Sequence, residues 1–219
     1  MATDKLDYKK AFKDLYLPKS IPTLIDVPPM SFIMINGKGN PNEEGGEYQS
    51  AVELVYGLSY AIKMSKMGKY VPEGYFEYVV PPLEGLWWLD DCGMDFSDKD
   101  KYFWTSMIRQ PEFVTREVFQ WACSEVIKKK PNLDVMKARL EIFNEGLCVQ
   151  MMHIGTYDNE PKTIAQMEDY ITSNNLKNAI STVRSDGTIR RHHEIYLSDP
   201  RKANLEKLKT VLRHPVEYK

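Results

Sequence analysis

The sequence has few cysteines, no surplus of either charge and no long apolar run. Its three cysteines, Cys92, Cys123 and Cys148, are widely spaced and form no Cys-x-x-Cys pair. An odd number of scattered thiols argues against a disulfide framework and is typical of a reduced protein. The 29 basic and 31 acidic side chains give a formal charge of −2, so nothing favours binding to nucleic acid or to an anionic membrane.

No segment approaches the roughly 18 consecutive apolar residues of a transmembrane helix, and the N-terminus shows neither an apolar signal core nor a twin arginine. We therefore expect a cytoplasmic protein. The 219 residues are enough to bury a sizeable core without disulfides or metal. Large side chains are abundant instead, with 13 Tyr, 8 Phe, 4 Trp and 11 Met. They suit cores and ligand pockets equally.

Hydrophobic periodicity predicts a mixed α and β chain. Residues 1–30 are expected to form a packing arm with a short helical period that Pro18 and Pro22 end. Helical spacing predicts helices over 47–64, 115–130, 134–143, 161–173 and about 199–215. Short apolar runs bounded by Gly or Pro predict strands over 31–36, 75–80, 86–89, 102–108, 147–154 and 191–197.

The order of elements repeats once. A first unit at about 31–90 and a second at about 146–198 each read strand, glycine turn, helix, strand with an acid, and a strand and helices at about 100–145 connect them. The repeat pairs Glu77 with Glu194. We expect an α+β domain over 31–219, in which two β-α-β-β units form one antiparallel sheet with the helices on one face and a ligand groove on the other.

Glu194 is the one carboxylate in the strand-like run 191–197. Alternation along a strand predicts two faces, one polar (His192, Glu194, Tyr196) and one that requires a core (His193, Ile195, Leu197). An acid beside a histidine and a phenol suits a concave site for a hydrophobic ligand that is cationic or electrophilic. The alternative is an edge strand whose polar face is wetted by solvent.

Three segments carry a resemblance to a known family, the GyrI-like small-molecule-binding family. His153-Ile154-Gly155-Thr156-Tyr157 fits its His-x-Gly-x-Tyr signature, and His193-Glu194-Ile195-Tyr196 fits its acidic strand. The segment 81–88 resembles a stand-alone subgroup of cyclopropanoid cyclopropyl hydrolases. The resemblance runs from about Ser31 to the C-terminus. No DNA-binding helical segment precedes the repeat here, so the role of the regulators in this family is not carried over.

The resemblance implies a protective protein that binds xenobiotics and leaves open whether it also hydrolyses cyclopropane-bearing DNA-alkylating compounds. It implies Glu194 and Tyr157 as the catalytic residues and an aromatic cage around the ligand. The other candidate ligand contacts are Trp87, Trp88, Trp104, Tyr196, His153 and Glu77. No cofactor is implied. Two alternatives stay open: a ligand-responsive interaction module without catalysis, and a regulator resembling a DNA gyrase inhibitor.

The structural alternative for each candidate is a place in the core or at the surface. Trp87 and Trp88 are neighbours on a strand and face opposite ways, so at most one enters a groove. His153 suits a hydrogen-bonded strand histidine as well as a ligand contact. His192 and His193 point apart and no ligand spacing completes a tetrahedral set, so we expect no metal. The sequence determines neither the ligand nor the oligomeric state.

Overall fold

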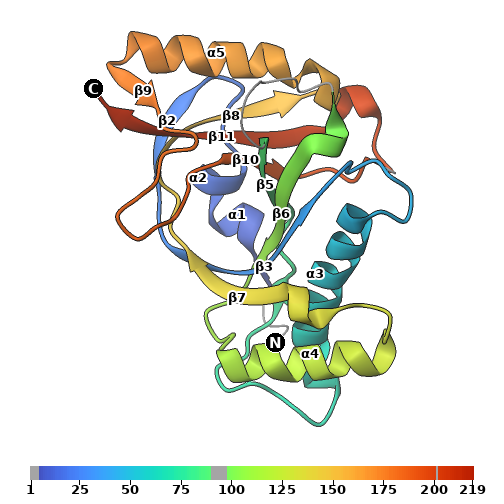
Figure 1. Ribbon diagram of the computed structural model, residues 1–219. Helices are drawn as coiled ribbons and strands as arrows, with labels where there is room; N and C mark the ends of the chain where they lie inside the picture. Colours follow the sequence, from blue (N-terminus) through green and yellow to red (C-terminus); the bar gives the residue numbers. More distant parts are fainter. Residues whose placement is uncertain (1–4, 90–97, 201) are drawn as a thin grey trace. The chain divides into compact units, whose positions relative to one another are not determined.

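The computed structural model describes residues 5–89, 98–200 and 202–219, and the chain within them divides into two compact units (Figure 1). Unit 1 holds residues 5–11, 30–81, 88–89 and 98–143, and unit 2 holds 12–29, 82–87, 144–200 and 202–219. Cys92 and the acidic pair Asp90-Asp91 lie outside the described residues. No helix of the described chain has the length and apolar character needed to cross a membrane.

Unit 1 is built on an antiparallel set of strands in the order β6-β3-β7. Its longer helix is amphipathic: Ala51, Leu54 and Leu58 are buried on one side of α3, as the sequence spacing predicts. The hydroxyl of Thr115 caps α4 by accepting from the backbone N–H of Val118 at 3.4 Å. The elements of unit 1 are β1 (Leu6–Asp7), α1 (Tyr8–Ala11), β3 (Met30–Lys38), α3 (Glu47–Met64), β4 (Tyr78–Val79), β6 (Tyr102–Arg109), α4 (Arg116–Lys129) and β7 (Ala138–Phe143).

Unit 2 pairs its strands in the order β2-β8-β11-β10, and residues 83–87 of β5 pair with β10. Helix α5 runs alongside β8 and β9 in Figure 1. Its Met167 and Ile171 pack on Leu212 of β11 and form the core of the unit. The elements are α2 (Lys13–Tyr16), β2 (Thr23–Val27), β5 (Leu83–Leu89, shared with unit 1), β8 (Gly146–Ile154), α5 (Glu160–Ser173), β9 (Leu176–Asn178), β10 (His192–Tyr196) and β11 (Lys209–Tyr218).

The fold is α+β with antiparallel strands and few helices, as predicted, and the predictions for α3, α4, α5, β3, β6, β8 and β10 are confirmed. Two predicted helices are wrong. Residues 138–143 form strand β7 after a 3₁₀ turn, and residues 209–218 form strand β11. In both segments pairing with neighbouring strands overrides a helical period that is only a few residues long.

The burial of strand β11 explains why the helical spacing of its leucines led to a wrong prediction. It lies between β8 and β10, and residues 210–216 are buried without a break, including Arg213 and His214. A strand buried on both faces shows no alternation, so Leu205, Leu208 and Leu212 mimicked a helix. The predicted arm likewise contains a strand, since Thr23–Val27 pairs with β8, and the predicted strand 75–80 shortens to β4.

Candidate functional site

Strand β10 positions Glu194 in unit 2. Alternation along β10 is as predicted: His193 and Ile195 are fully buried, while the side chains of His192 and Glu194 keep 17% and 14% of their exposure. Glu194 lies beside Leu212 of β11, which packs against α5. The Glu194 face of unit 2 is therefore the face that α5 covers. The sequence placed Glu194 and the ligand groove on the face without helices, whereas Glu194 lies on the other face in unit 2.

Aromatic side chains lie on the same face of unit 2 as Glu194. The ring of Tyr157, just before α5, meets the ring of Tyr196 edge to face at 6.1 Å between centroids. The indole Nε1 of Trp87 donates to the Tyr196 hydroxyl at 2.8 Å. Gly85 is the residue of β5 that faces Glu194, and a Cβ there would lie 2.6 Å from Trp87 Nε1. A glycine is thus required for these rings to approach β5.

A second carboxyl group, that of Glu160, is close enough to Glu194 for the two to interact electrostatically. Glu160 is the first residue of α5, is only 8% exposed, and its Oε1 has no hydrogen-bond partner in the described chain. Burial, and then the charges of Glu194 and Asp158, raise its pKa to about 10, so it is a neutral acid at pH 7. No sequence feature pointed to Glu160, because an acid in the first turn of a helix is ordinarily a solvated surface residue.

Tyr157 also keeps its proton. Burial raises its pKa to about 12, with smaller contributions from Glu194, Glu160 and Asp199. His192 Nε2 lies 3.1 Å from Oε1 of Glu194. The site therefore combines the carboxyl group of Glu194 with two neutral O–H groups, those of Glu160 and Tyr157, and with the imidazole of His192. Such a set is expected where a proton is taken from one atom and given to another.

Comparison with known proteins shows the family of the chain. A family model for the GyrI-like small molecule binding domain matches residues 22–217. The chain belongs to the GyrI-like family. The resemblance read from the three sequence segments is confirmed, and GyrI-like domains bind small molecules.

Three crystal structures from Listeria innocua resemble this GyrI-like chain over its length. One, an uncharacterized conserved protein, is 50% identical with a TM-score of 0.89 and covers 97% of this chain and 100% of its own. The other two are hydrolases: one is 49% identical with a TM-score of 0.85 and covers 97% and 100%, and one is 48% identical with a TM-score of 0.86 and covers 98% and 100%. No curated protein matches the chain.

The structure brings together Glu194, Tyr157, Tyr196 and Trp87 of this GyrI-like domain, and places other predicted residues elsewhere. Of the two adjacent tryptophans, Trp87 contacts Tyr196, whereas Trp88 belongs to unit 1 and stacks on Phe103. Among the described residues, no group of three or more His, Cys, Asp or Glu side chains is arranged to hold a metal ion.

Three further candidates have structural partners. His153 is buried, with Nδ1 2.9 Å from the Thr163 hydroxyl and Nε2 2.9 Å from the Thr156 carbonyl. Trp104 is fully buried in unit 1, where its ring meets Tyr48 and fills the space above Gly37. Glu77 also belongs to unit 1 and is ion-paired with Lys66. In chain order the strand that corresponds to β10 in the first repeat is β5, so Glu77 is not the counterpart of Glu194.

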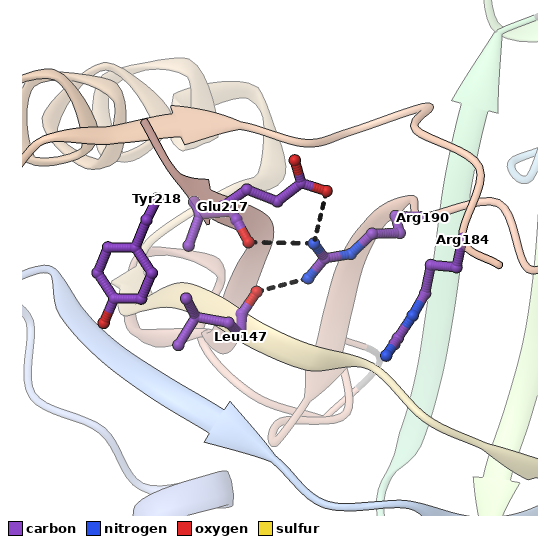
Figure 2. A pocket seen from close by; sticks show the side chains of 6 residues that line it. Leu147, Arg184, Arg190, Glu217 and Tyr218 are labelled. Atoms are coloured by element: carbon purple, nitrogen blue, oxygen red, sulfur yellow. Dashed lines mark hydrogen bonds and ion pairs between the residues drawn. The ribbon is translucent and has the colours of Figure 1, made fainter.

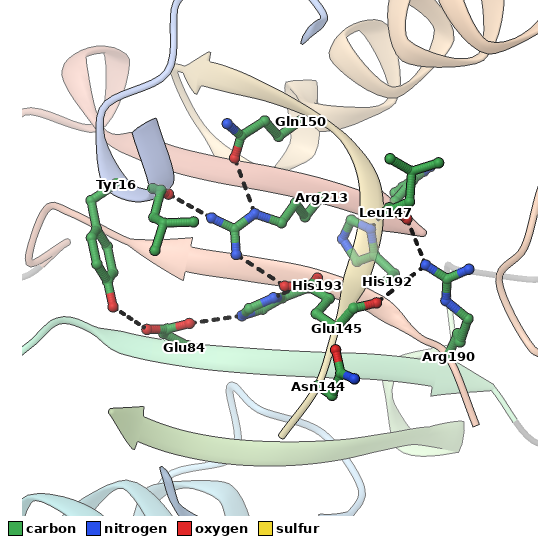
Figure 3. Close-up of polar contacts among 12 residues, drawn as sticks. Tyr16, Glu84, Asn144, Glu145, Leu147, Gln150, Arg190, His192, His193 and Arg213 are labelled. Atoms are coloured by element: carbon green, nitrogen blue, oxygen red, sulfur yellow. Dashed lines mark hydrogen bonds and ion pairs between the residues drawn. The ribbon is translucent and has the colours of Figure 1, made fainter. Parts of the chain in front are cut away.

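The opposite face of β10 carries a buried ion network (Figure 3). Oε1 of Glu145 lies 2.9 Å from His193 Nδ1, and Oε2 lies 3.0 Å from Arg213 NH1. His193 Nε2 lies 3.0 Å from Glu84, which also accepts from Tyr16. The predicted apolar face of β10 is thus partly ionic. Two carboxylates balance two cations, which makes the burial of all four tolerable.

A shallow cavity of about 320 Å³ is lined by Arg184, Arg190 and Glu217 (Figure 2). It is not the ligand site that the sequence predicts. Arg190 is buried, and its guanidinium donates to the carbonyls of Leu147 and Val216 and lies 4.0 Å from Glu217. Because its guanidinium is engaged in these contacts, Arg190 links the ends of β8 and β11 and is not available to bind an anionic ligand.

Proposed function

We propose that this GyrI-like protein is protective: it binds hydrophobic xenobiotics that are cationic or electrophilic against Glu194 and hydrolyses those that carry a strained cyclopropane ring. The observation that carries the proposal is that Glu194 acts on the neutral acid Glu160 and on Tyr157, whose ring contacts that of Tyr196. A carboxylate held next to aromatic faces suits a flat cation, with attraction on the order of 0.5–2 kcal/mol per ring.

The same groups suit hydrolysis. Glu194 takes a proton from a water molecule whose oxygen forms a bond to a ring carbon, and the strained carbon–carbon bond breaks. Its electron pair moves into the conjugated carbonyl group of the ligand, and Tyr157 or Glu160 donates a proton to the oxygen that gains the charge. The product is the ligand plus one water. Positioned base catalysis typically contributes about 10²–10⁴ in rate, and the strain of the ring lowers the remaining barrier.

Two relatives support the hydrolytic part. Both Listeria proteins described as hydrolases are aligned over their full length with this chain at 48–49% identity. The descriptions of these relatives include no substrate, so the cyclopropane ring is inferred from the family resemblance of the sequence and from the acid and base groups of the site.

The test is incubation of the purified protein with a cyclopropane-bearing alkylating agent, followed by mass spectrometry for the ring-opened product. We expect turnover by the wild type and a loss of about 10²-fold or more in Glu194→Gln, because glutamine cannot accept the proton. Glu77→Gln is the matched control, since it removes the same charge from unit 1. It should keep full activity.

Binding is measured in parallel by quenching of tryptophan fluorescence. Binding without turnover would overturn hydrolysis and leave sequestration. In a pull-down with this protein as the bait, a change in the captured proteins on addition of the ligand would favour an interaction module. If Glu194→Gln changes neither binding nor turnover, the site is assigned wrongly.

A further inference from the structure

Glu194 is one end of a chain of hydrogen-bonded side chains. His192 Nε2 lies 3.1 Å from Oε1 of Glu194, and His192 Nδ1 lies 2.8 Å from Nε2 of His214. His214 Nδ1 in turn lies 3.1 Å from Oε1 of Glu168. The chain passes from β10 through β11 to α5 within unit 2. Its inner end, Glu194, is 14% exposed and its outer end, Glu168, is 40% exposed.

The number of protons in this chain follows from its geometry. Each of the three contacts is short enough for a hydrogen bond and therefore needs one proton between its two heavy atoms. Two neutral imidazoles supply only two protons, and two ionised carboxylates supply none. The third contact requires one extra proton. Without it, two lone pairs would face each other at one of the three contacts.

The extra proton rests toward the inner end. The hydrogen bond from His214 lowers the pKa of Glu168, which keeps that carboxylate ionised at neutral pH. Burial lowers the pKa of His214, with Glu168 opposing and His192 adding to the effect, so this imidazole stays neutral. The extra proton then lies in the inner contact, between His192 Nε2 and Oε1 of Glu194. The other titratable groups near Glu194 are Glu160 and Tyr157, both protonated at pH 7.

We propose that His192, His214 and Glu168 form a proton relay that carries the proton taken up by Glu194 out to solvent. The inference rests on the proposed hydrolysis, in which Glu194 is the base. None of the three relay residues needs to touch the ligand. They act through Glu194, by removing the proton that it has taken up before the next turnover.

Of the arrangements that satisfy every contact, two are the ends of the path. In the first, Glu194 carries the proton and donates to His192 Nε2, each Nδ1–H donates to the next group, and Glu168 is ionised. In the second, each proton has moved across its own hydrogen bond, so Glu194 is ionised and Glu168 carries the proton. One positive charge thus crosses the chain in three short hops without movement of a side chain, and Glu168 then exchanges its proton with water.

A ligand bound against Glu194 makes such a path useful. Hydrolysis adds one water to the ligand, so the proton that Glu194 removes equals the one that Glu160 or Tyr157 gives. After each turnover the base must lose a proton and the acid must regain one. With the ligand over the site, the exit through His192 and His214 remains open on the side of α5.

Nuclear magnetic resonance of the imidazole nitrogens tests the relay without a substrate. The protein has four histidines, so the long-range ¹H–¹⁵N spectrum is simple. We expect Glu168→Gln to change the ¹⁵N shifts of His214 and also of His192, two contacts away. Asp169→Asn is the matched control, because it removes an exposed charge from the next residue of α5. It should leave both rings unchanged.

Kinetics add a second readout. Glu168→Gln should lower kcat and leave KM unchanged, and Glu168→Asp, which keeps the charge, should restore part of the loss. A change confined to His214 in the spectrum, or equal kinetics for Glu168→Gln and Asp169→Asn, would overturn the relay. The outcomes separate the two proposals: a protein that shows the coupled shifts but no turnover refutes the hydrolysis and keeps the hydrogen-bonded chain.

Discussion

The buried ion network predicts how the stability of the protein depends on pH. Burial opposes the charge on His193, but Glu145 and Glu84 outweigh it and raise its pKa from 6.5 to about 9. Each pKa unit corresponds to about 1.4 kcal/mol, so the ion pairs stabilise the charged imidazole by about 3 kcal/mol. This agrees with the cost of about 3–5 kcal/mol for removing one partner of a buried ion pair.

The sign of the effect follows from the direction of each shift. Because the folded pKa of His193 is raised, its contribution is complete below pH 6.5 and is lost as the pH rises through about 9. For Glu145, burial opposes ionisation, but His193 and Arg213 lower its pKa from 4.5 to about 2. Its contribution is complete above pH 4.5 and is lost as the pH falls through about 2. The two figures describe one shared interaction and are not summed.

Urea unfolding at about pH 6 and about pH 9 measures the effect. We expect the wild type to lose about 3 kcal/mol of its free energy of unfolding over this range, relative to His193→Gln, which cannot gain a charge. Urea is chosen because guanidinium salts would screen the ions. The matched control is His153→Gln, since His153 is equally buried but contacts Thr163 and a backbone carbonyl in place of carboxylates.

The reasoning is refuted if wild type and His193→Gln respond equally to pH while His153→Gln behaves like the wild type. Should His193→Gln not fold, Glu84→Gln gives the same comparison. It removes one carboxylate from His193 and leaves Glu145 in place, so the loss between pH 6 and 9 should shrink without disappearing.

Two further predictions concern the site. Gly85→Ala places a Cβ 2.6 Å from Trp87 Nε1 and 3.1 Å from the Tyr196 hydroxyl, so it should weaken ligand binding and cost about 1–3 kcal/mol in unfolding free energy; unchanged binding and stability would contradict the close approach. Glu160→Gln should raise the melting temperature more at about pH 8 than at about pH 5, because the raised pKa makes the wild-type acid costly as the pH rises from 4.5 toward 10 and glutamine does not ionise. Equal gains at both pH values would show that Glu160 is not held neutral.

Local sequence features determined most of the elements whose hydrophobic pattern matches their own secondary structure. Helix α3 shows a helical period over 18 residues, and its predicted bounds are those observed. Strand β10 is short, but its alternation alone separated His192 and Glu194 from His193. These predictions succeed because the direction of a side chain on a regular element is fixed by backbone geometry alone.

Tertiary contacts decided the rest. Strands β7 and β11 were predicted as helices. Strand β11 is buried on both faces and so loses its alternation, whereas the short helical period of β7 is overridden by its pairing with β3. The face that carries Glu194 was assigned to the wrong side of the sheet, because periodicity gives the relative direction of neighbours and never which layer covers them. Trp87 and Trp88 were equivalent in sequence and differ only in what each ring contacts.

The site shows the same division. Alternation along a strand pointed to Glu194 and Tyr196 and the family resemblance pointed to Tyr157, but nothing in the sequence indicated Glu160 or the path through His214 to Glu168. An acid becomes neutral and a histidine becomes part of a relay only when burial and distant partners act on them. Those effects depend on distances in space between residues far apart in the chain, so only the folded structure determines them.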